Sequence, residues 1–311
     1  MSAVSPAATR PVLAPRQRVD LPAALLLVLL CACWGLQQVT VKLAADGGLP
    51  PVLQAGLRSL IAVLCLGAWQ TARGRLRTLT VRDGTYRLGA LIAACFALEF
   101  VLMFVGLTHT SASRGVVILY TTPFFVALGG HFCVPGERIG RWQVAGLVLA
   151  FGGVAVAMLH RPAGGGATLL GDGLVLASAV AWAATTLIIK ATRLARVPAA
   201  KVLFYQLAGS VPLLFAISAA IGESWAIGPA TPLAWLALAY QSLVVAFATY
   251  LAWFWLITRY PAGLISAFTF LTPLFGILAG AALLGETLSA SLLLAFACVA
   301  IGLRLVNRRS R

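Results

Sequence analysis

One stretch of the sequence occurs twice, first as Val117-Ile118-Leu119-Tyr120-Thr121-Thr122-Pro123-Phe124-Phe125 and again as Ala267-Phe268-Thr269-Phe270-Leu271-Thr272-Pro273-Leu274-Phe275. Each copy is apolar, carries Thr-Pro near its middle and is followed by Gly-Glu, at Gly136-Glu137 and Gly285-Glu286. Proline removes a backbone donor and clashes with the preceding turn, so we expect a kink in each segment. In lipid the freed carbonyl needs a partner, from the preceding threonine, a neighbouring helix or water. The repeat therefore predicts a duplicated membrane protein with two broken helices.

The composition is typical of a polytopic helical membrane protein. Of the 311 residues, 61% are hydrophobic and only 10% are charged, which is too little polar surface for a soluble domain of this size. Runs of about twenty apolar residues predict transmembrane helices, and they lack the period-two alternation of a β-barrel. The formal charge of +15 lies in short loops between these runs. The expected partners are therefore the lipid bilayer and a small-molecule substrate, and no nucleic acid.

The apolar runs predict an all-α fold with ten transmembrane helices. Their expected ranges are 21–45, 50–70, 87–108, 112–133, 141–160, 171–191, 198–221, 231–257, 261–285 and 287–306. On this arrangement 19 of the 23 lysines and arginines fall on one side of the membrane. The positive-inside rule then predicts an inner-membrane protein with both termini cytoplasmic. Residues 1–20 are expected to form a disordered cytoplasmic tail, and residues 307–311 a short one.

A second match extends the duplication to both halves of the chain. Trp34 is followed by Lys42 eight residues later, and Trp182 by Lys190 at the same spacing. Residues 21–160 and 171–306 are thus predicted to be two five-helix repeats, with a linker at 161–170. Because five is odd, the second repeat is inverted relative to the first. Inverted repeats with broken helices at the midplane are the architecture of secondary transporters.

These motifs together resemble the drug/metabolite transporter superfamily, in its ten-helix EamA-type branch. The similarity covers residues 21–306 and depends on Trp34-Gly35 with Lys42, on Pro followed by Gly-Glu, and on their duplication. It implies an export carrier for amino acids or other small metabolites, with a central cavity between the halves. Within the branch the chain is similar to bacterial amino acid exporters of the YddG kind, some of which accept aromatic amino acids. The second half departs from the pattern with Ala183 in place of the glycine.

Glu99 lies near the middle of the span 87–108, among apolar residues. A carboxylate at that depth costs about 2.5–3.5 kcal/mol on insertion scales, so we expect it to face a cavity or a partner. It could bind a substrate ammonium or hold a coupling proton. The alternative is a structural pair with Arg58 in the span 50–70. The corresponding stretch of the second half, Phe247-Ala248-Thr249, has no acid, which favours a functional role.

Each of the other charged residues near the spans has two possible roles, one functional and one structural. Lys42, Arg58 and Lys190 are predicted mouth charges, although lysines at span ends also snorkel and anchor. Arg58 is deeper and could pair with Glu99 or with a substrate carboxylate. Glu137 and Glu286 each precede the next helix by a few residues, where a carboxylate favours the helix N-terminus. Gating at the two opposite mouths is the alternative for both.

The predicted central cavity is lined by polar and aromatic residues of the spans. Such a lining suits amphipathic or aromatic substrates better than sugars or phosphates, and core packing is the alternative for any one residue. The expected substrate contacts are Trp34, Gln38, Glu99, Tyr120, Trp182, Thr186, Phe268 and Thr269, with Tyr250 and Trp253 as further aromatic candidates. Pro123 and Pro273 are predicted to be paired hinges. Gly276-x-x-x-Gly280 predicts one close helix contact.

We therefore expect a secondary transporter that exports small amphipathic metabolites, above all amino acids, by alternating access. A channel-like facilitator should show a ring of like charge, and an exporter of cationic or aromatic drugs is the other alternative. An intramembrane enzyme would need several midplane acids or histidines, and a scaffold or sensor an extramembrane domain. The sequence has no Gly-x-x-x-x-Gly-Lys-Ser/Thr loop and no catalytic or metal cluster. No enzymatic activity, cofactor or metal is therefore expected, and the chain is predicted to be a monomer or weak homodimer.

Overall fold

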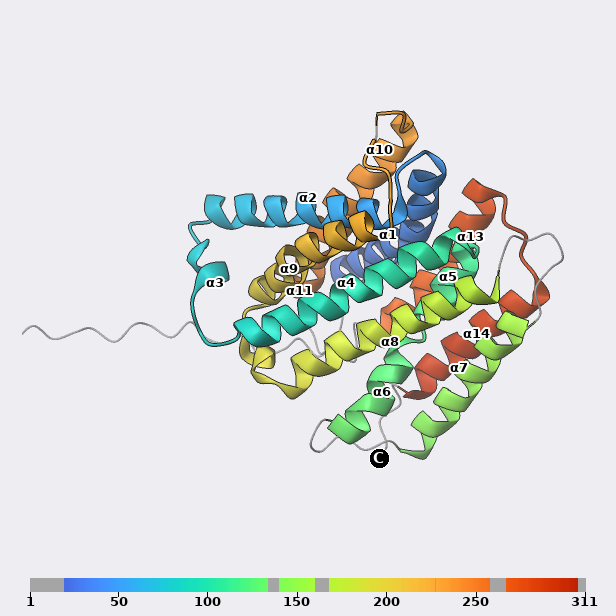
Figure 1. Cartoon of the computed structure of the whole chain (residues 1–311). Helices are drawn as coiled ribbons and strands as arrows, with labels where there is room; N and C mark the ends of the chain where they lie inside the picture. The colour runs from blue at the N-terminus through green and yellow to red at the C-terminus, as the bar shows by residue number, and fades with distance from the viewer. Residues whose placement is uncertain (1–19, 134–139, 160–167, 227, 258–266, 307–311) are drawn as a thin grey trace, which may run out of the picture.

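The computed structural model describes residues 20–133, 140–159, 168–226, 228–257 and 267–306, and these ranges contain helices and loops but no strand (Figure 1). Residues 1–19 and 307–311 of the predicted tails, Glu137 and most of the predicted linker lie outside the described residues. Within the described ranges seven helical segments are long and apolar enough to cross a membrane. Three shorter apolar helices, within α7, α13 and α14, account for the remaining predicted spans.

The helices follow the predicted spans to within a few residues. The first half contains α1 (Leu21–Asp46), α2 (Pro51–Ala72), the short loop helix α3 (Arg77–Thr80), α4 (Tyr86–Thr108), α5 (Ala112–Leu119), α6 (Thr122–Cys133) and α7 (Arg141–Leu159). The second half contains α8 (Leu169–Ala191), η1 (Arg193–Arg196), α9 (Ala199–Ala220), α10 (Pro232–Ala239), η2 (Tyr240–Thr249), α11 (Tyr250–Ile257), η3 (Ala267–Phe270), α13 (Leu271–Leu284) and α14 (Ala290–Val306).

Local sequence signals explain where many of these helices begin. A side-chain oxygen before the first turn can accept a hydrogen bond from an N–H that the helix leaves unpaired. This happens at the starts of α1, α5, α8 and α10, where the acceptors are Asp20, Ser111, Thr168 and Thr231. Proline also occupies the first helical position of α2 and α10, where its missing N–H costs nothing.

Both Thr-Pro segments depart from a regular α-helix near the proline, in agreement with the predicted kinks. In the first copy α5 ends at Leu119 and α6 begins at Thr122, immediately before Pro123. The hydroxyl of Thr121 donates to the carbonyl of Ile118 at 2.6 Å, and that of Thr122 donates to the carbonyl of Leu119 at 2.7 Å. The threonines thus satisfy carbonyls at the break, as lipid requires. In the second copy the 3-10 turn η3 leads into α13, whose third residue is the proline.

The two halves interlock as an inverted repeat, with counterpart helices packed against each other. α2 contacts α9, α5 contacts α13 and α7 contacts α14, and Figure 1 shows α2 beside α9 and α7 beside α14. Because each pair consists of counterparts, we infer that the approximate two-fold axis passes between its members. The packing of α4 on α8 is mirrored by that of α1 on α10 and η2, and the packing of α1 on α13 by that of α8 on α6. The broken helices therefore meet at the centre of one bundle.

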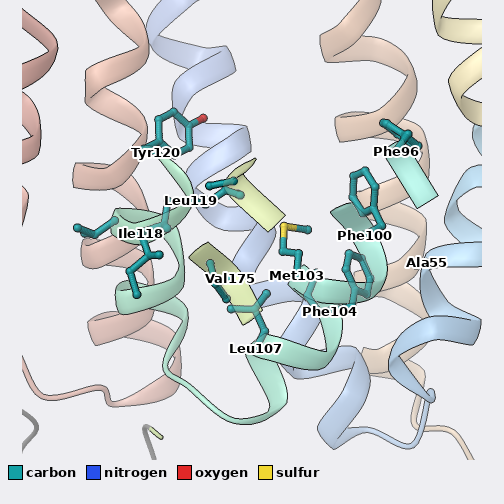
Figure 2. Close-up of a cluster of buried hydrophobic side chains, with 14 of the residues drawn as sticks. Ala55, Phe96, Phe100, Met103, Phe104, Leu107, Ile118, Leu119, Tyr120 and Val175 are labelled. Atoms are coloured by element: carbon teal, nitrogen blue, oxygen red, sulfur yellow. The ribbon is translucent and has the colours of Figure 1, made fainter. Parts of the chain in front are cut away.

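The largest hydrophobic cluster of the bundle is organised along α4. Phe96, Phe100 and Phe104 follow one another at i, i+4 spacing, which places them on one side of the helix, with ring centroids 4.6 and 5.7 Å apart. Figure 2 shows these rings toward Ala55 of α2, while Met103 faces the side of α5 and α8. The residue before Phe100 is Glu99, so this cluster also fixes the position of the buried acid.

Glycines bring α13 into close contact with α5 and α1. A Cβ on Gly276 would lie 2.6 Å from Cγ1 of Val116, and one on Gly280 would meet the side chain of Ser113. The predicted Gly-x-x-x-Gly contact is therefore confirmed. A Cβ on Gly35, which follows the first motif tryptophan, would lie 2.7 Å from the backbone nitrogen of Gly276. Gly35 thus marks the point where α1 crosses the broken helix of the other half.

Candidate functional site

Two residues of opposite charge are buried inside the bundle, Arg58 on α2 and Glu99 on α4. Arg58 has no exposed surface, and Glu99 is 6% exposed. The guanidinium carbon of Arg58 lies 4.2 Å from the centroid of the Phe100 ring. Its charge faces the hydroxyl of Tyr250 and the carboxylate of Glu99. The structure therefore places Arg58 in the interior of the bundle, away from either surface.

The buried charges share a site without a direct ion pair. Within the described part of the chain no salt bridge joins Arg58 to Glu99. No guanidinium nitrogen of Arg58 makes a hydrogen bond of standard geometry with a described residue. A buried charge is costly unless it is paired and hydrogen-bonded. Arg58 therefore lacks an ion-pair partner among the described residues, although the Tyr250 hydroxyl and the Glu99 carboxylate lie near it.

Tyr250 connects this charged site to the first of two aromatic pairs. Its hydroxyl neighbours Arg58 and Glu99 and also the phenol of Tyr120, at the break between α5 and α6. Tyr120 in turn packs edge-to-face against Trp182 of α8, with ring centroids 6.1 Å apart. Two of the predicted cavity residues, Tyr120 and Trp182, are thus in contact, and Tyr250 packs against the same hydrophobic cluster.

The second aromatic pair contains Trp34, the counterpart of Trp182. Its indole nitrogen donates to the hydroxyl of Thr249 at 2.8 Å, and its ring meets Trp253 edge-to-face at 5.3 Å. Phe268 packs against the same cluster. Each repeat tryptophan therefore pairs with an aromatic residue of the opposite half, which puts both pairs at the junction of the halves.

The remaining predicted cavity residues lie on the same helices with different environments. Gln38 is buried, and its amide oxygen has no hydrogen-bond partner among the described residues. Thr186 donates to the carbonyl of Trp182 at 3.1 Å, within α8. Thr269 is half-buried in η3, next to Phe268. Gln241, which is fully buried in η2 with its side-chain nitrogen and oxygen unpaired in the described structure, is a polar candidate of the same kind as Gln38.

The span that contains Thr249 has an unusual backbone. Tyr240–Thr249 form a π-helix between α10 and α11, a rare conformation that is frequent at functional sites. Tyr240 donates from its hydroxyl to the carbonyl of Cys33, at 2.9 Å. The sequence shows neither glycine nor proline in this segment, so local signals did not predict the change of helix type.

Lys42 is held by the backbone of another helix. Its ammonium donates to the carbonyls of Leu107 and Thr110, both at 2.9 Å. Leu107 lies in the last turn of α4, where carbonyl groups lack partners within the helix. Lys42 thus connects α1 to the end of α4 and the turn that follows it, and its role as a mouth charge stays a prediction. Lys190 lies exposed at the other end of the bundle, near the C-terminus of α8.

A buried ion pair near Lys42 joins the two halves and was not predicted. Arg114 of α5 donates through Nε to Asp172 of α8 at 3.2 Å, and Nη2 of the same arginine contacts the other carboxylate oxygen. Thr110 also donates to Asp172, at 2.6 Å. Asp172 has no exposed surface and Arg114 only 4%. This cluster fixes α5 against α8 at the same end of the bundle as Lys42.

Glu286 caps a helix, but not the helix predicted. Its carboxylate accepts from the N–H groups of Ala112 at 2.6 Å and Ser113 at 2.8 Å, at the start of α5 in the opposite half. Gly285, with φ +63°, gives the turn that directs Glu286 there. The following helix α14 is capped instead by Ser289. Gly285-Glu286, the second copy of the motif, is therefore a contact between the halves.

Comparison with known proteins agrees with this architecture. Residues 21–159 and 169–308 each match the sequence model of the EamA-like transporter family. The "Uncharacterized transporter YvbV" of Bacillus subtilis is 33% identical over 93% of this chain and 92% of its own. A "Probable amino-acid metabolite efflux pump" of Salmonella typhimurium is 28% identical over 85% of this chain and 87% of its own. A crystal structure with 21% identity covers 92% of this chain and 97% of its own, with a TM-score of 0.65, and supports the fold alone.

In the described residues, seven apolar helices of membrane-spanning length and three shorter ones form two interlocked inverted repeats with buried charges where the halves meet. This is the architecture of a membrane transporter. Both halves match one family, and a relative at 33% identity matches along nearly the whole length. The chain belongs to the EamA-like transporter family.

Proposed function

We propose that the protein is a secondary transporter that exports small amphipathic metabolites, and amino acids in particular, by alternating access. The observation that carries this proposal is the buried site of Arg58, Glu99 and Tyr250 beside the broken helices. Two relatives named "Probable amino-acid metabolite efflux pump", from Salmonella typhimurium and Escherichia coli, support the substrate class.

The two buried charges suit a zwitterion. Arg58 offers hydrogen-bond donors in a planar fork that matches a carboxylate, and Glu99 offers an acceptor for an ammonium group. Neither forms an ion pair with the other in the described structure. A zwitterionic amino acid bound between them would place its carboxylate at Arg58 and its ammonium group at Glu99. Both buried charges would then be paired, which lowers the cost of their burial. A purely anionic or cationic ligand would leave one of them uncompensated.

The aromatic pairs suit the apolar part of such a substrate. The Trp34–Trp253 and Tyr120–Trp182 pairs lie at the junction of the halves and offer apolar and π surface to a ligand. A site of this kind binds amphipathic side chains through contact area and orients them through few polar groups. Aromatic or branched amino acids are the side-chain class that it favours.

Pro123 and Pro273 are proposed as hinges for alternating access. Each follows a break in a helix, and these helices, α5 with α6 and η3 with α13, lie on the approximate two-fold axis. Because a break removes backbone hydrogen bonds, the segments on its two sides can reorient at lower cost than a continuous helix.

Glu99 is proposed as the proton carrier. Its carboxylate exchanges the substrate ammonium for a proton and so couples export to proton entry.

The direct test is counterflow in proteoliposomes with labelled amino acids. We expect uptake to be stimulated by the same amino acid inside the vesicle, as a carrier shows and a pore does not. Arg58→Gln and Glu99→Gln should each reduce counterflow at least tenfold, with the exposed positions Arg75→Gln and Asp46→Asn as matched charge controls. Transport above that of empty vesicles for none of the amino acids would refute the proposal.

Analogue competition tests the role of each charge. With the wild-type protein, the decarboxylated amine and the deaminated acid of a substrate should both compete poorly. In Arg58→Gln the amine should compete as well as the amino acid, because the partner of the carboxylate is gone. Amines that compete better than amino acids against the wild-type protein would instead favour an exporter of cationic compounds. Glu99→Gln should also remove the pH dependence of transport if this acid exchanges the proton.

A further inference from the structure

The structure has a pocket at the end of the bundle opposite Lys42, outside the site described above. It measures about 510 Å³ and lies between the start of α4 and the end of α8 with η1. Leu88 comes from the first half, and the other lining residues come from the second half: Lys190, Ala191, Thr192, Arg193, Ala195 and Arg196. We refer to these seven residues as the basic pocket. Its size is within the range of small-ligand sites.

The charge of the basic pocket is positive, with three cations and no acid in its lining. Lys190, Arg193 and Arg196 are exposed. Nη2 of Arg193 donates to the carbonyl of Gly84 at 3.4 Å, which ties this side chain to the segment before α4. The described acid close to this segment, Asp83, is engaged by Lys201 at 2.7 Å. The exposed Arg193 and Arg196 therefore give the pocket a positive charge that favours an anion.

The basic pocket lies at the boundary between the apolar spans and the loops. α4 begins at Tyr86 and α8 ends at Ala191, so the pocket is level with the ends of two membrane-spanning helices. Leu88 and the two alanines give it an apolar side. Leu91, 48% exposed, lies one turn further into the span on the same face of α4. An anion with an apolar tail fits this arrangement better than a free inorganic ion.

We propose that the basic pocket binds the headgroup phosphate of an anionic phospholipid of the phosphatidylglycerol type. The three cations contact the phosphodiester, and the acyl chains follow the apolar face of α4 past Leu88 and Leu91. The positive-inside rule predicts that this end faces the cytoplasm, where anionic lipids attract basic groups near the surface. Since the pocket joins α4 of one half to α8 of the other, the bound lipid stabilises this packing of the two halves.

The test measures thermal unfolding of the purified full chain in neutral detergent, followed by tryptophan fluorescence. Dioctanoyl phosphatidylglycerol is titrated against dioctanoyl phosphatidylcholine, with glycerol 1-phosphate and inorganic phosphate as soluble arms. A ligand that binds the folded state raises the unfolding temperature in proportion to its occupancy. We expect phosphatidylglycerol to raise it at much lower concentration than the other three compounds. The measurement needs no transport, so it is independent of the proposed function.

Two triple variants test whether the stabilisation by phosphatidylglycerol depends on the basic pocket. The triple variant Lys190→Gln, Arg193→Gln and Arg196→Gln should raise the midpoint concentration of phosphatidylglycerol roughly 100-fold, at about fivefold per basic contact near a membrane surface. The matched triple variant removes three exposed arginines of the neighbouring loop, Arg73, Arg75 and Arg77, and should change the midpoint less than threefold. Native mass spectrometry should show one retained phosphatidylglycerol in the wild type and in the loop variant, and none in the pocket variant.

Three results would overturn the proposal. Equal stabilisation by phosphatidylcholine would show that the headgroup charge is not recognised. Equal losses in the two triple variants would show general electrostatic attraction without a site. Stabilisation by a soluble phosphate at the same concentration as the lipid would assign the pocket to a soluble anion. If the triple variant does not fold, Arg193→Gln alone should still raise the midpoint roughly fivefold.

Discussion

Replacement of Asp172 by asparagine should destabilise the protein strongly. Asp172 has no exposed surface and accepts from Arg114 and Thr110. Asparagine keeps the shape of the side chain but leaves the Arg114 guanidinium buried without its counter-charge. Loss of one partner of a buried pair costs about 3–5 kcal/mol. At about 2 °C per kcal/mol for a large domain, the unfolding temperature should fall by roughly 6–10 °C.

The double variant separates the ion pair from simple packing. Arg114→Met with Asp172→Leu removes both charges and keeps apolar volume, which is often neutral or stabilising. We expect it to recover most of the loss, less about 1 kcal/mol for the Thr110 hydroxyl, which loses its acceptor. Thermal unfolding in detergent micelles measures all three proteins, with the exposed Asp46→Asn as the control. A single variant equal to that control, or a double variant worse than the single one, would refute the reasoning.

Three further predictions use the same unfolding measurement. Gly35→Ala should cost about 1–3 kcal/mol, because the new methyl group meets the backbone of α13, whereas Gly67→Ala, with open space around it, should cost nothing. Glu286→Gln should cost about 1–2 kcal/mol, because a charged acceptor at the start of α5 becomes neutral; a larger loss in Asp46→Asn would contradict this. The hydrogen bond from Lys201 holds the pKa of Asp83 well below its usual range. The stability that the charged Asp83 carboxylate contributes is therefore fully present above about pH 4 and is lost as the pH falls through the lower folded pKa. Asp83→Asn should be less stable than the wild type at neutral pH, and this difference should shrink as the pH falls below about 4.

The sequence could predict the helices and the breaks because both are local. An apolar run of about twenty residues defines a span wherever the chain goes, and proline interrupts a helix in any fold. The threonine hydroxyls at Thr121 and Thr122 reach carbonyls three residues back, so their role also follows from the local sequence. The duplication then placed the two breaks together, because a repeat of five helices must invert.

The partners of buried charges could not be predicted in the same way. Arg114 and Asp172 are 58 residues apart and in different halves, so periodicity within either span contains no information about their contact. Asp172 lies in the first turn of its helix, where an acid is favourable without any further partner. This local explanation gives no reason to expect the ion pair with Arg114. Glu286 was predicted to cap the next helix for the same reason. Its carboxylate instead accepts hydrogen bonds from the first N–H groups of α5, in the other half.

The helices of the two halves are related by approximate symmetry, but their buried polar side chains are not. This difference affects how the protein would bind a substrate. Position 99 carries an acid on the α-helix α4, whereas its counterpart Thr249 lies in a π-helix and accepts from Trp34. Trp182, the counterpart of Trp34, packs on Tyr120 instead. In the proposed alternating access, a symmetric framework would let the two mouths open in turn by equivalent motions. Because Glu99 and Arg58 are both on helices of the first half, the charged groups of a substrate bound between them would stay attached to that half while the second half moves. The prediction that follows is that Glu99→Thr with Thr249→Glu would restore a carboxylate to the interior without restoring transport of zwitterions, since Arg58 would no longer share a half with the acid.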